Sequence, residues 1–249
     1  MKIKTIVLVG SLGVGLLSAS GSTPVSLQNA TATFSQTYYG DYSVGTSING
    51  TTWDYLGWAI YDGDASGGVT EPQTAVFETT TDVGYSGGSR LEFTFQFDNW
   101  NPYHFIGRFR LSVTTDDRST FADGLATGGD VTANWTVLDV GSMTSLAGTP
   151  LSELADGSVL ASGPLLDWWD YYKIEADTTL TGITGVRLEV LADASLPTDG
   201  PGRQPDNGNF ILSEFGLNIT PISPVPEPAA PVGVFSALLA FGWLKRRRV

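Results

Sequence analysis

Alternation of apolar and polar residues is the feature of this sequence that most limits its fold. In segment 91–97 every second side chain is apolar, and Glu, Thr and Gln lie between them. Segments 108–113 and 186–190 repeat the pattern. Because a period of two places successive side chains on opposite faces, these segments are predicted to be half-buried antiparallel strands.

Further strands are predicted at 74–78 and 135–138, and at 210–219, where Ile211, Phe215, Leu217 and Ile219 would share one apolar face. Clusters of Gly, Asp and Asn separate the runs and are typical of turns. Segment 143–154 alone leaves room for a turn of helix. We therefore predict an all-β chain folded as an antiparallel β-sandwich, in one domain over residues 21–220.

Composition excludes several classes of site. The chain has no cysteine, which excludes disulfides, thiolate catalysis and cysteine-ligated zinc. Its single histidine, His104, would have to serve any serine–histidine–aspartate triad. Segment 21–223 holds seven basic and 25 acidic residues, a net charge of about −18. Nucleic acid is therefore not an expected partner, because a phosphate backbone needs a basic face.

Residues 1–20 have the pattern of a secretory signal peptide. Lys2 and Lys4 precede a short apolar run, and Ser18-Ala19-Ser20 supplies the small residues of a cleavage site. The run is short for a helix that spans a bilayer. We therefore expect an exported protein.

The C-terminal end combines three features in order. A proline-rich linker occupies 221–228, and an apolar stretch that would form a hydrophobic helix is followed by a basic end within 229–249. The motif residues are Pro226, Glu227, Pro228, Arg246, Arg247 and Arg248. This arrangement resembles the PEP-CTERM sorting signal. The resemblance implies an exosortase-type protease as partner, transient anchoring in the inner membrane, and release to the cell envelope or extracellular matrix. A plain, unprocessed membrane anchor is the alternative.

The middle of the chain also resembles a known family. The similarity lies in segments 31–36, 47–50, 57–60, 107–114 and 182–189, and is most specific in Gly-Pro-Gly-Arg at 200–203 and Asn-Gly-Asn-Phe at 207–210. Together they resemble the galactose-binding-like (discoidin-type) jelly rolls of planctomycete-type exported proteins. The resemblance implies a sandwich that binds rather than catalyses, with a glycan or exopolysaccharide as partner and a structural calcium ion.

Two sets of oxygen ligands are candidates for that calcium. Asp62, Asp64 and Ser66 stand at positions 1, 3 and 5 of an EF-hand-type loop, but position 12 is not a glutamate. The family would place calcium between a turn and the last strand, which here points to Asn49 and Glu214. The alternatives are a solvated loop and a solvent-facing Glu214.

Exposed aromatic rings are the candidate sugar ligands, since flat ring faces stack on C–H surfaces. One cluster contains Trp100, Tyr103 and His104, and the other contains Trp168 and Trp169. The alternative is that the aromatic residues of 167–172 fill the core and that His104 is a structural histidine.

Three functions follow from these patterns. The first is a non-catalytic envelope or matrix protein that binds polysaccharide, and the second is a structural or adhesive surface protein without a small-ligand site. The third, a carbohydrate-active enzyme, would need two carboxyl groups across a cleft. Gly84-Tyr-Ser-Gly-Gly88 fits the G-x-S-x-G motif, but a strand is predicted after it where the motif needs a helix, so we interpret it as a turn and expect no enzyme.

Overall fold

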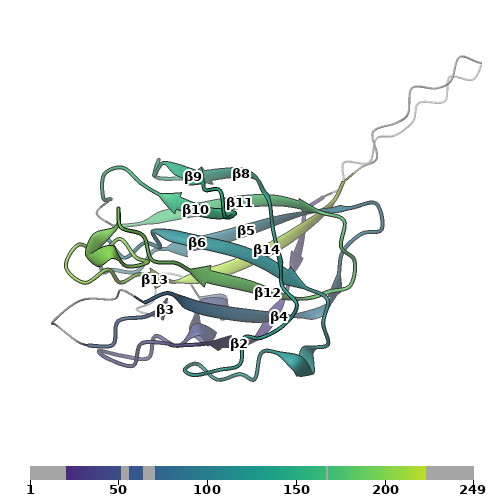
Figure 1. The fold of residues 1–249 in the computed structure, drawn as a ribbon, viewed down its shortest axis with the longest axis horizontal. Helices are drawn as coiled ribbons and strands as arrows, with labels where there is room; N and C mark the ends of the chain where they lie inside the picture. Colours follow the sequence, from purple (N-terminus) through teal and green to yellow (C-terminus); the bar gives the residue numbers. More distant parts are fainter. Residues whose placement is uncertain (1–20, 52–55, 64–70, 167, 223–249) are drawn as a thin grey trace, which may run out of the picture.

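The computed structural model describes residues 21–51, 56–63, 71–166 and 168–222, and these form an all-β structure. Two antiparallel sheets pack face to face as a β-sandwich (Figure 1). The predicted signal peptide, the residues of the sorting motif, and Asp64 and Ser66 lie outside the described residues. No helix in the described part of the chain is long and apolar enough to cross a membrane.

The sheets are built from strands distant in sequence. The five-stranded sheet has the order β1 (Thr23–Val25), β14 (Glu214–Pro221), β5 (Ser89–Phe97), β11 (Asp170–Thr178) and β8 (Val140–Ser145). The seven-stranded sheet has the order β2 (Leu27–Ala32), β4 (Gln73–Val83), β12 (Ile183–Val190), β6 (Arg108–Thr114), β10 (Ser158–Ala161) and β9 (Leu151–Glu153), with β7 (Thr136–Val137) paired to β6. β13 (Ile211–Leu212) pairs with β3 (Trp58–Ala59), and three 3-10 turns are η1 (Val44–Ile48), η2 (Arg118–Thr120) and η3 (Pro197–Asp199).

The core lies between the sheets, as the alternation predicted. All four apolar residues of segment 91–97 are buried. Phe95 of one sheet packs on Phe109 of the other with ring centroids 4.7 Å apart, and Phe77 stacks on Phe215 at 4.9 Å. Each such aromatic pair adds about 0.5–1.5 kcal/mol beyond the area it buries.

Two predictions about local structure were wrong. Segment 210–219 is divided into β13 and β14, and Ile211 packs in a small cluster with Tyr42 and Ala59 instead of sharing the face of β14. Segment 143–154, where the sequence left room for a turn of helix, contains the end of β8 and all of β9. Pairing decides the conformation in both places: β13 and β8 pair with the remote strands β3 and β11, and β9 pairs with the nearby β10.

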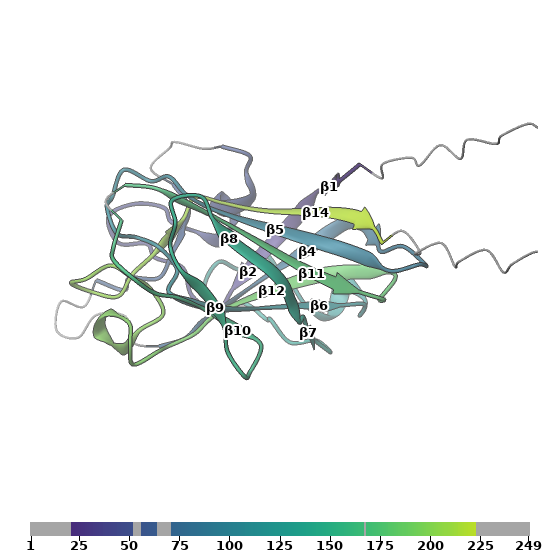
Figure 2. The same ribbon diagram turned by 90° about the horizontal axis from the view of Figure 1, so that it is seen from above.

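Antiparallel pairing brings several loops together at one end of the sandwich. Phe97 at the end of β5 lies opposite Asp170 at the start of β11, and Val190 pairs with Gln73. The loops that leave these positions form what we call the loop end, made of segments 34–42, 98–107, 162–166, 168–169 and 191–210. Strands β1 and β14 lie side by side and reach the opposite end (Figure 2).

Candidate functional site

The two aromatic clusters predicted separately meet at the loop end. His104 and Trp168 line one crevice, together with Phe97, Asn99, Asn101, Phe105 and Ile211. The crevice is too narrow to admit a water molecule, so the accessible surface is its rim. A crevice between β5, β11 and β13 therefore joins residues more than sixty positions apart in sequence.

The tryptophans of both clusters are exposed. Trp100, Trp168 and Trp169 keep 54%, 58% and 45% of their surface accessible. The core-filling alternative for segment 167–172 holds only for Tyr172, which is fully buried. Tyr103 is half-buried. Several solvent-exposed indole rings at one end of a domain are typical of a binding surface.

Asn99, which the sequence did not single out, is the polar centre of the crevice. Its side chain is 3% exposed, and its Oδ1 accepts hydrogen bonds from the backbone N–H and the side-chain amide of Asn101. Its Nδ2 group is buried and has no hydrogen-bond partner within the described residues. Leaving a buried donor unpaired costs about 1–3 kcal/mol, so Nδ2 of Asn99 is an unsatisfied donor inside the crevice.

His104 is a structural side chain within this crevice. Its Nδ1 lies 2.8 Å from the carbonyl oxygen of Pro102, which makes Nδ1–H the donor. Burial lowers the pKa of His104 below its ordinary 6.5, although the hydrogen bonds to backbone carbonyls of Pro102 and Asn101 oppose this. The imidazole is therefore neutral at pH 7, and because its one N–H is on Nδ1, its Nε2 can only accept a hydrogen bond.

Arg203 hydrogen-bonds to the backbone shortly before Trp168 and Trp169. Its guanidinium is buried, and Nη2 donates to the carbonyl oxygens of Gly163 at 2.7 Å and Pro164 at 3.3 Å. Hydrogen bonds from a charged donor contribute about 1.5–3 kcal/mol, and a buried charge needs them. Arg203 therefore sets the path of the chain that leads to Trp168.

Asp170, which directly follows Trp169, is fixed by hydrogen bonds to neighbouring segments. It is 2% exposed and accepts hydrogen bonds from the hydroxyls of Ser145 and Thr149 and from the backbone N–H of Ala147 and Tyr171. These donors occupy both carboxylate oxygens. Asp170 therefore anchors the start of β11 to segment 145–149.

The motif most specific for the family resemblance has a structural role. At Gly202 a Cβ atom would collide with the carbonyl oxygens of Gly208 and Asn209, so the two halves of the loop touch only because residue 202 is glycine. The Asn209 side chain accepts from Ile60 N–H and donates to Gln36 Oε1, each at 3.0 Å. Loop 200–210 therefore joins segment 34–42 to the segment that contains Ile60.

The predicted pair of Asn49 and Glu214 is brought together by the fold. Both carboxylate oxygens of Glu214 accept from the Gly50 N–H, at 3.3 and 3.2 Å, and Asn49 Oδ1 accepts from Thr51 N–H at 2.7 Å. They border a groove of about 410 Å³. Glu214 is thus not simply a solvent-facing charge, because it fastens η1 and its following turn to β14.

The described part of this pair supplies one carboxylate and one side-chain amide oxygen toward a calcium ion. Calcium takes six to eight oxygen ligands from carboxylates, carbonyl groups and water. Within the described ranges no three acidic or histidine side chains group as metal ligands, and the Gly50 N–H donates to the Glu214 carboxylate. Asp62 of the other candidate set is exposed.

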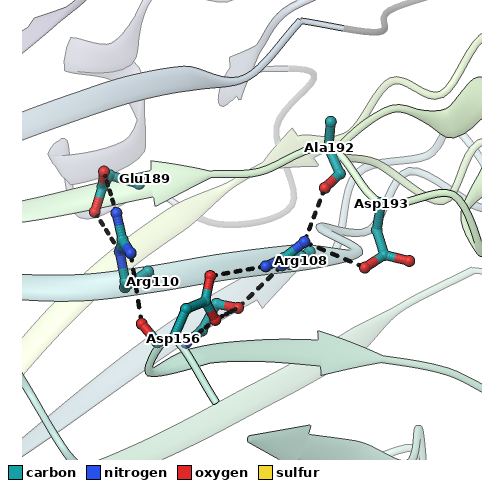
Figure 3. Close-up of polar contacts among 7 residues, drawn as sticks. Arg108, Arg110, Asp156, Glu189, Ala192 and Asp193 are labelled. Atoms are coloured by element: carbon teal, nitrogen blue, oxygen red, sulfur yellow. Dashed lines mark hydrogen bonds and ion pairs between the residues drawn. The ribbon is translucent and has the colours of Figure 1, made fainter. Parts of the chain in front are cut away.

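Charged residues on the outer face of the seven-stranded sheet pair with one another (Figure 3). Arg108 contacts Asp156 at 2.8 Å and Asp193 at 3.3 Å, and Arg110 contacts Glu189 at 2.8 Å. Arg108 also donates to the carbonyl oxygen of Ala192. Because these cations are already neutralised by neighbouring carboxylates, the network joins β6, β10 and β12 and does not form an anion site.

The Gly84–Gly88 motif is a turn, as interpreted from the sequence. It connects β4 directly to β5, with Gly88 N–H donating to the Tyr85 carbonyl oxygen at 2.9 Å. No helix follows Ser86, so the strained strand-to-helix elbow that activates a serine is not formed.

Comparison with known proteins identifies no family. No protein-family model and no curated protein sequence matches the chain. A solved chain of the beta-galactosidase BgaA from Streptococcus pneumoniae superposes with a TM-score of 0.45 at 10% identity, covering 79% of this chain and 98% of that one. The family 32 CBM of NanJ from C. perfringens, solved in complex with galactose, has a TM-score of 0.35 at the same identity and coverage. Neither likeness is close enough to assign a function.

Proposed function

We propose that this chain is an exported, non-catalytic β-sandwich protein of the cell envelope or extracellular matrix that binds neutral carbohydrate at its loop end. The observation that carries the proposal is the exposed indole of Trp168 at the rim of the crevice that His104 and Asn99 also line, with the exposed Trp100 and Trp169 next in sequence to Asn99 and Trp168. Indole faces can stack on the C–H faces of sugar rings.

The charge of the domain supports a neutral ligand. Segment 21–223 carries a net charge of about −18, which repels polyanionic glycans and nucleic acids. The residues bordering the crevice are aromatic, aliphatic, amide or imidazole side chains. A ligand with hydroxyl groups and apolar C–H faces matches both properties.

The strand order supports a jelly roll of the galactose-binding-like kind. With β2, β8 and the short strands other than β1 and β10 set aside, β1 pairs with the last strand in the order β1-β14-β5-β11, and β4-β12-β6-β10 form the other sheet. Consecutive strands of this set alternate between the sheets, except that β6 and β10 pair within one sheet, an arrangement found in double Greek-key jelly rolls.

A non-catalytic role is supported by the chemistry of the acid beside the tryptophans. Asp170 is buried and engaged by hydroxyl and backbone donors on both oxygens. A glycosidase would need one carboxyl as acid and a second as base or nucleophile across the bound sugar. Asp170 is placed to anchor a loop.

Isothermal titration calorimetry with galactose and glucose oligosaccharides tests the binding proposal. Trp168→Ala is expected to weaken binding at least about tenfold, because an indole stack is worth roughly 1.4 kcal/mol or more. Tyr85→Ala is the matched control, since Tyr85 is an exposed aromatic in the turn after β4, away from the loop end. Equal affinities for Trp168→Ala and wild type would overturn the proposal.

Export and sorting rest on the sequence motifs alone. We propose cleavage after about Ser20, transient anchoring through 229–249, and processing near Pro226-Glu227-Pro228 by an exosortase-type protease. Mass spectrometry of the protein from fractionated cells measures both ends. An intact tail in the membrane fraction would favour the plain anchor.

A structural or adhesive surface protein is the second candidate. The narrowness of the crevice favours it, because a surface without an open cavity needs no small ligand. It predicts no heat of binding with any tested sugar, and unchanged cell adhesion when Trp100, Trp168 or Trp169 is replaced by alanine.

A further inference from the structure

Three tyrosines form a second exposed aromatic group on the loop end. The ring centroids of Tyr38 and Tyr39 are 4.1 Å apart, and those of Tyr38 and Tyr61 are 6.1 Å apart. Tyr38 is 45% exposed and Tyr39 is 81% exposed. Tyr39 and Tyr38 therefore contribute little to the core and present ring surface to solvent.

The backbone around these rings is shaped to display them. Tyr39 has a φ of 66°, in the left-handed region that non-glycine residues rarely adopt. Strain of this kind is usually compensated by packing, but Tyr39 is the most exposed large hydrophobic side chain of the described residues. Tyr38 lies against Gly63, where a Cβ atom would come within 3.1 Å of the ring. Because residue 63 is glycine, the Tyr38 ring can pack directly against the backbone at that position.

Packing connects the loop that carries Tyr38 and Tyr39 to the tryptophan crevice. Tyr42, at the end of this loop, packs in one cluster with Ala59 and Ile211. Ile211 lines the crevice together with His104 and Trp168. The two aromatic groups therefore lie on neighbouring loops of the loop end.

We propose that Tyr38, Tyr39 and Tyr61 form a second carbohydrate subsite, and that the chain binds an extended neutral oligosaccharide which spans this tyrosine subsite and the tryptophan crevice. The inference rests on the proposed function and names its ligand class. One sugar ring can stack on only one of the two groups, whereas a chain of several rings can stack on both. Affinity then rises with the length of the oligosaccharide.

Calorimetry with β-1,4-linked galactose oligomers, from the monosaccharide to the hexasaccharide, tests this inference, with the matching glucose series in parallel. For the wild-type protein we expect affinity to rise about tenfold or more along one series, the effect of one additional stacked ring. The double variant Tyr38→Ala/Tyr39→Ala is expected to lose that rise while keeping the affinity for the shortest bound oligomer. Because both rings are largely exposed, thermal unfolding should confirm that this variant remains folded.

Trp168→Ala and Tyr85→Ala separate the possible failures. Loss of all binding in Trp168→Ala, with an unchanged length dependence in the tyrosine variant, overturns the tyrosine subsite and leaves the proposed function standing. Unchanged binding in Trp168→Ala overturns the proposed function itself. Absence of binding by the wild-type protein to both series overturns both, and Tyr85→Ala should behave as wild type in every case.

Discussion

The buried guanidinium of Arg203 donates a hydrogen bond to the carbonyl oxygen of Gly163 across 2.7 Å, although 40 positions separate the two residues. This contact joins the loop after η3 to the segment that precedes Trp168. The same guanidinium lies near the fully buried Tyr172 hydroxyl, whose pKa is raised mainly by burial and lowered in part by Arg203. The Arg203 guanidinium therefore contacts both the backbone before Trp168 and the buried Tyr172 beneath the proposed binding surface.

Replacing Arg203 with lysine should weaken both the fold and the loop end. A lysine keeps the charge but cannot reproduce the planar fork that reaches Gly163 and Pro164. We expect the free energy of unfolding, measured by urea titration, to fall by about 2 kcal/mol. Arg90→Lys is the control, because Arg90 is exposed and pairs with exposed Asp177, so its change should stay below about 0.5 kcal/mol. Equal effects of the two variants would contradict the role assigned to Arg203.

Gly202→Ala should be strongly destabilising for a steric reason. The added methyl group would collide with the backbone oxygens of Gly208 and Asn209, which cannot move without breaking the loop. We expect a loss of about 2–4 kcal/mol by thermal or chemical unfolding. At Gly45 a Cβ atom meets nothing within 4 Å, so Gly45→Ala should be nearly neutral. A stable Gly202→Ala protein would mean that the loop tolerates another path.

Calcium should leave the stability of the protein unchanged. The described part of the Asn49–Glu214 site offers one carboxylate, and Gly50 N–H already occupies it. We expect melting temperatures in excess chelator and in millimolar calcium to agree within about 1 °C, since a ligand that does not bind the native state cannot stabilise it. Glu214→Gln should lower the melting temperature equally in both conditions. A calcium-dependent rise that Glu214→Gln removes would contradict this assignment.

Acid should remove part of the stability through the network of Figure 3. The Ser158 hydroxyl, assisted by Arg108, lowers the pKa of Asp156 from 3.8 to about 2. Because the folded-state pKa lies below the unfolded value, the folded protein holds fewer protons, and the contribution is complete above about pH 4. It is lost as the pH falls from about 4 to about 2.

Asp156→Asn should therefore flatten the pH dependence of unfolding in that window. Since the Asp156 side chain is 42% exposed, solvent screening limits the effect to less than about 1 kcal/mol. Urea titrations between pH 2 and pH 6 measure it. Asp139→Asn, at an exposed position outside the network, is the control and should keep the wild-type slope. A wild-type slope in Asp156→Asn would show that other carboxylates account for the acid sensitivity.

The sequence alone determined the strands at 91–97, 108–113 and 186–190 and which of their faces is buried. In segment 91–97 the period of two is a local property of the chain, and every apolar residue there is buried as predicted. The glycine-rich turn at 84–88 was also predictable, because a short connection between two strands depends on nearby residues. The aromatic candidates at Trp100 and Trp168 were visible as residue types.

Only the tertiary structure decided which of these residues meet. Trp168 lies beside His104 because β11 pairs with β5 in a register that no local pattern specifies. The same long-range pairing detaches Ile211 from the face of β14 and leaves the Asn99 Nδ2 group buried without a hydrogen-bond partner among the described residues. Closing such loops costs conformational entropy that contacts throughout the core must offset, so the arrangement of the loop end is a property of the whole sandwich.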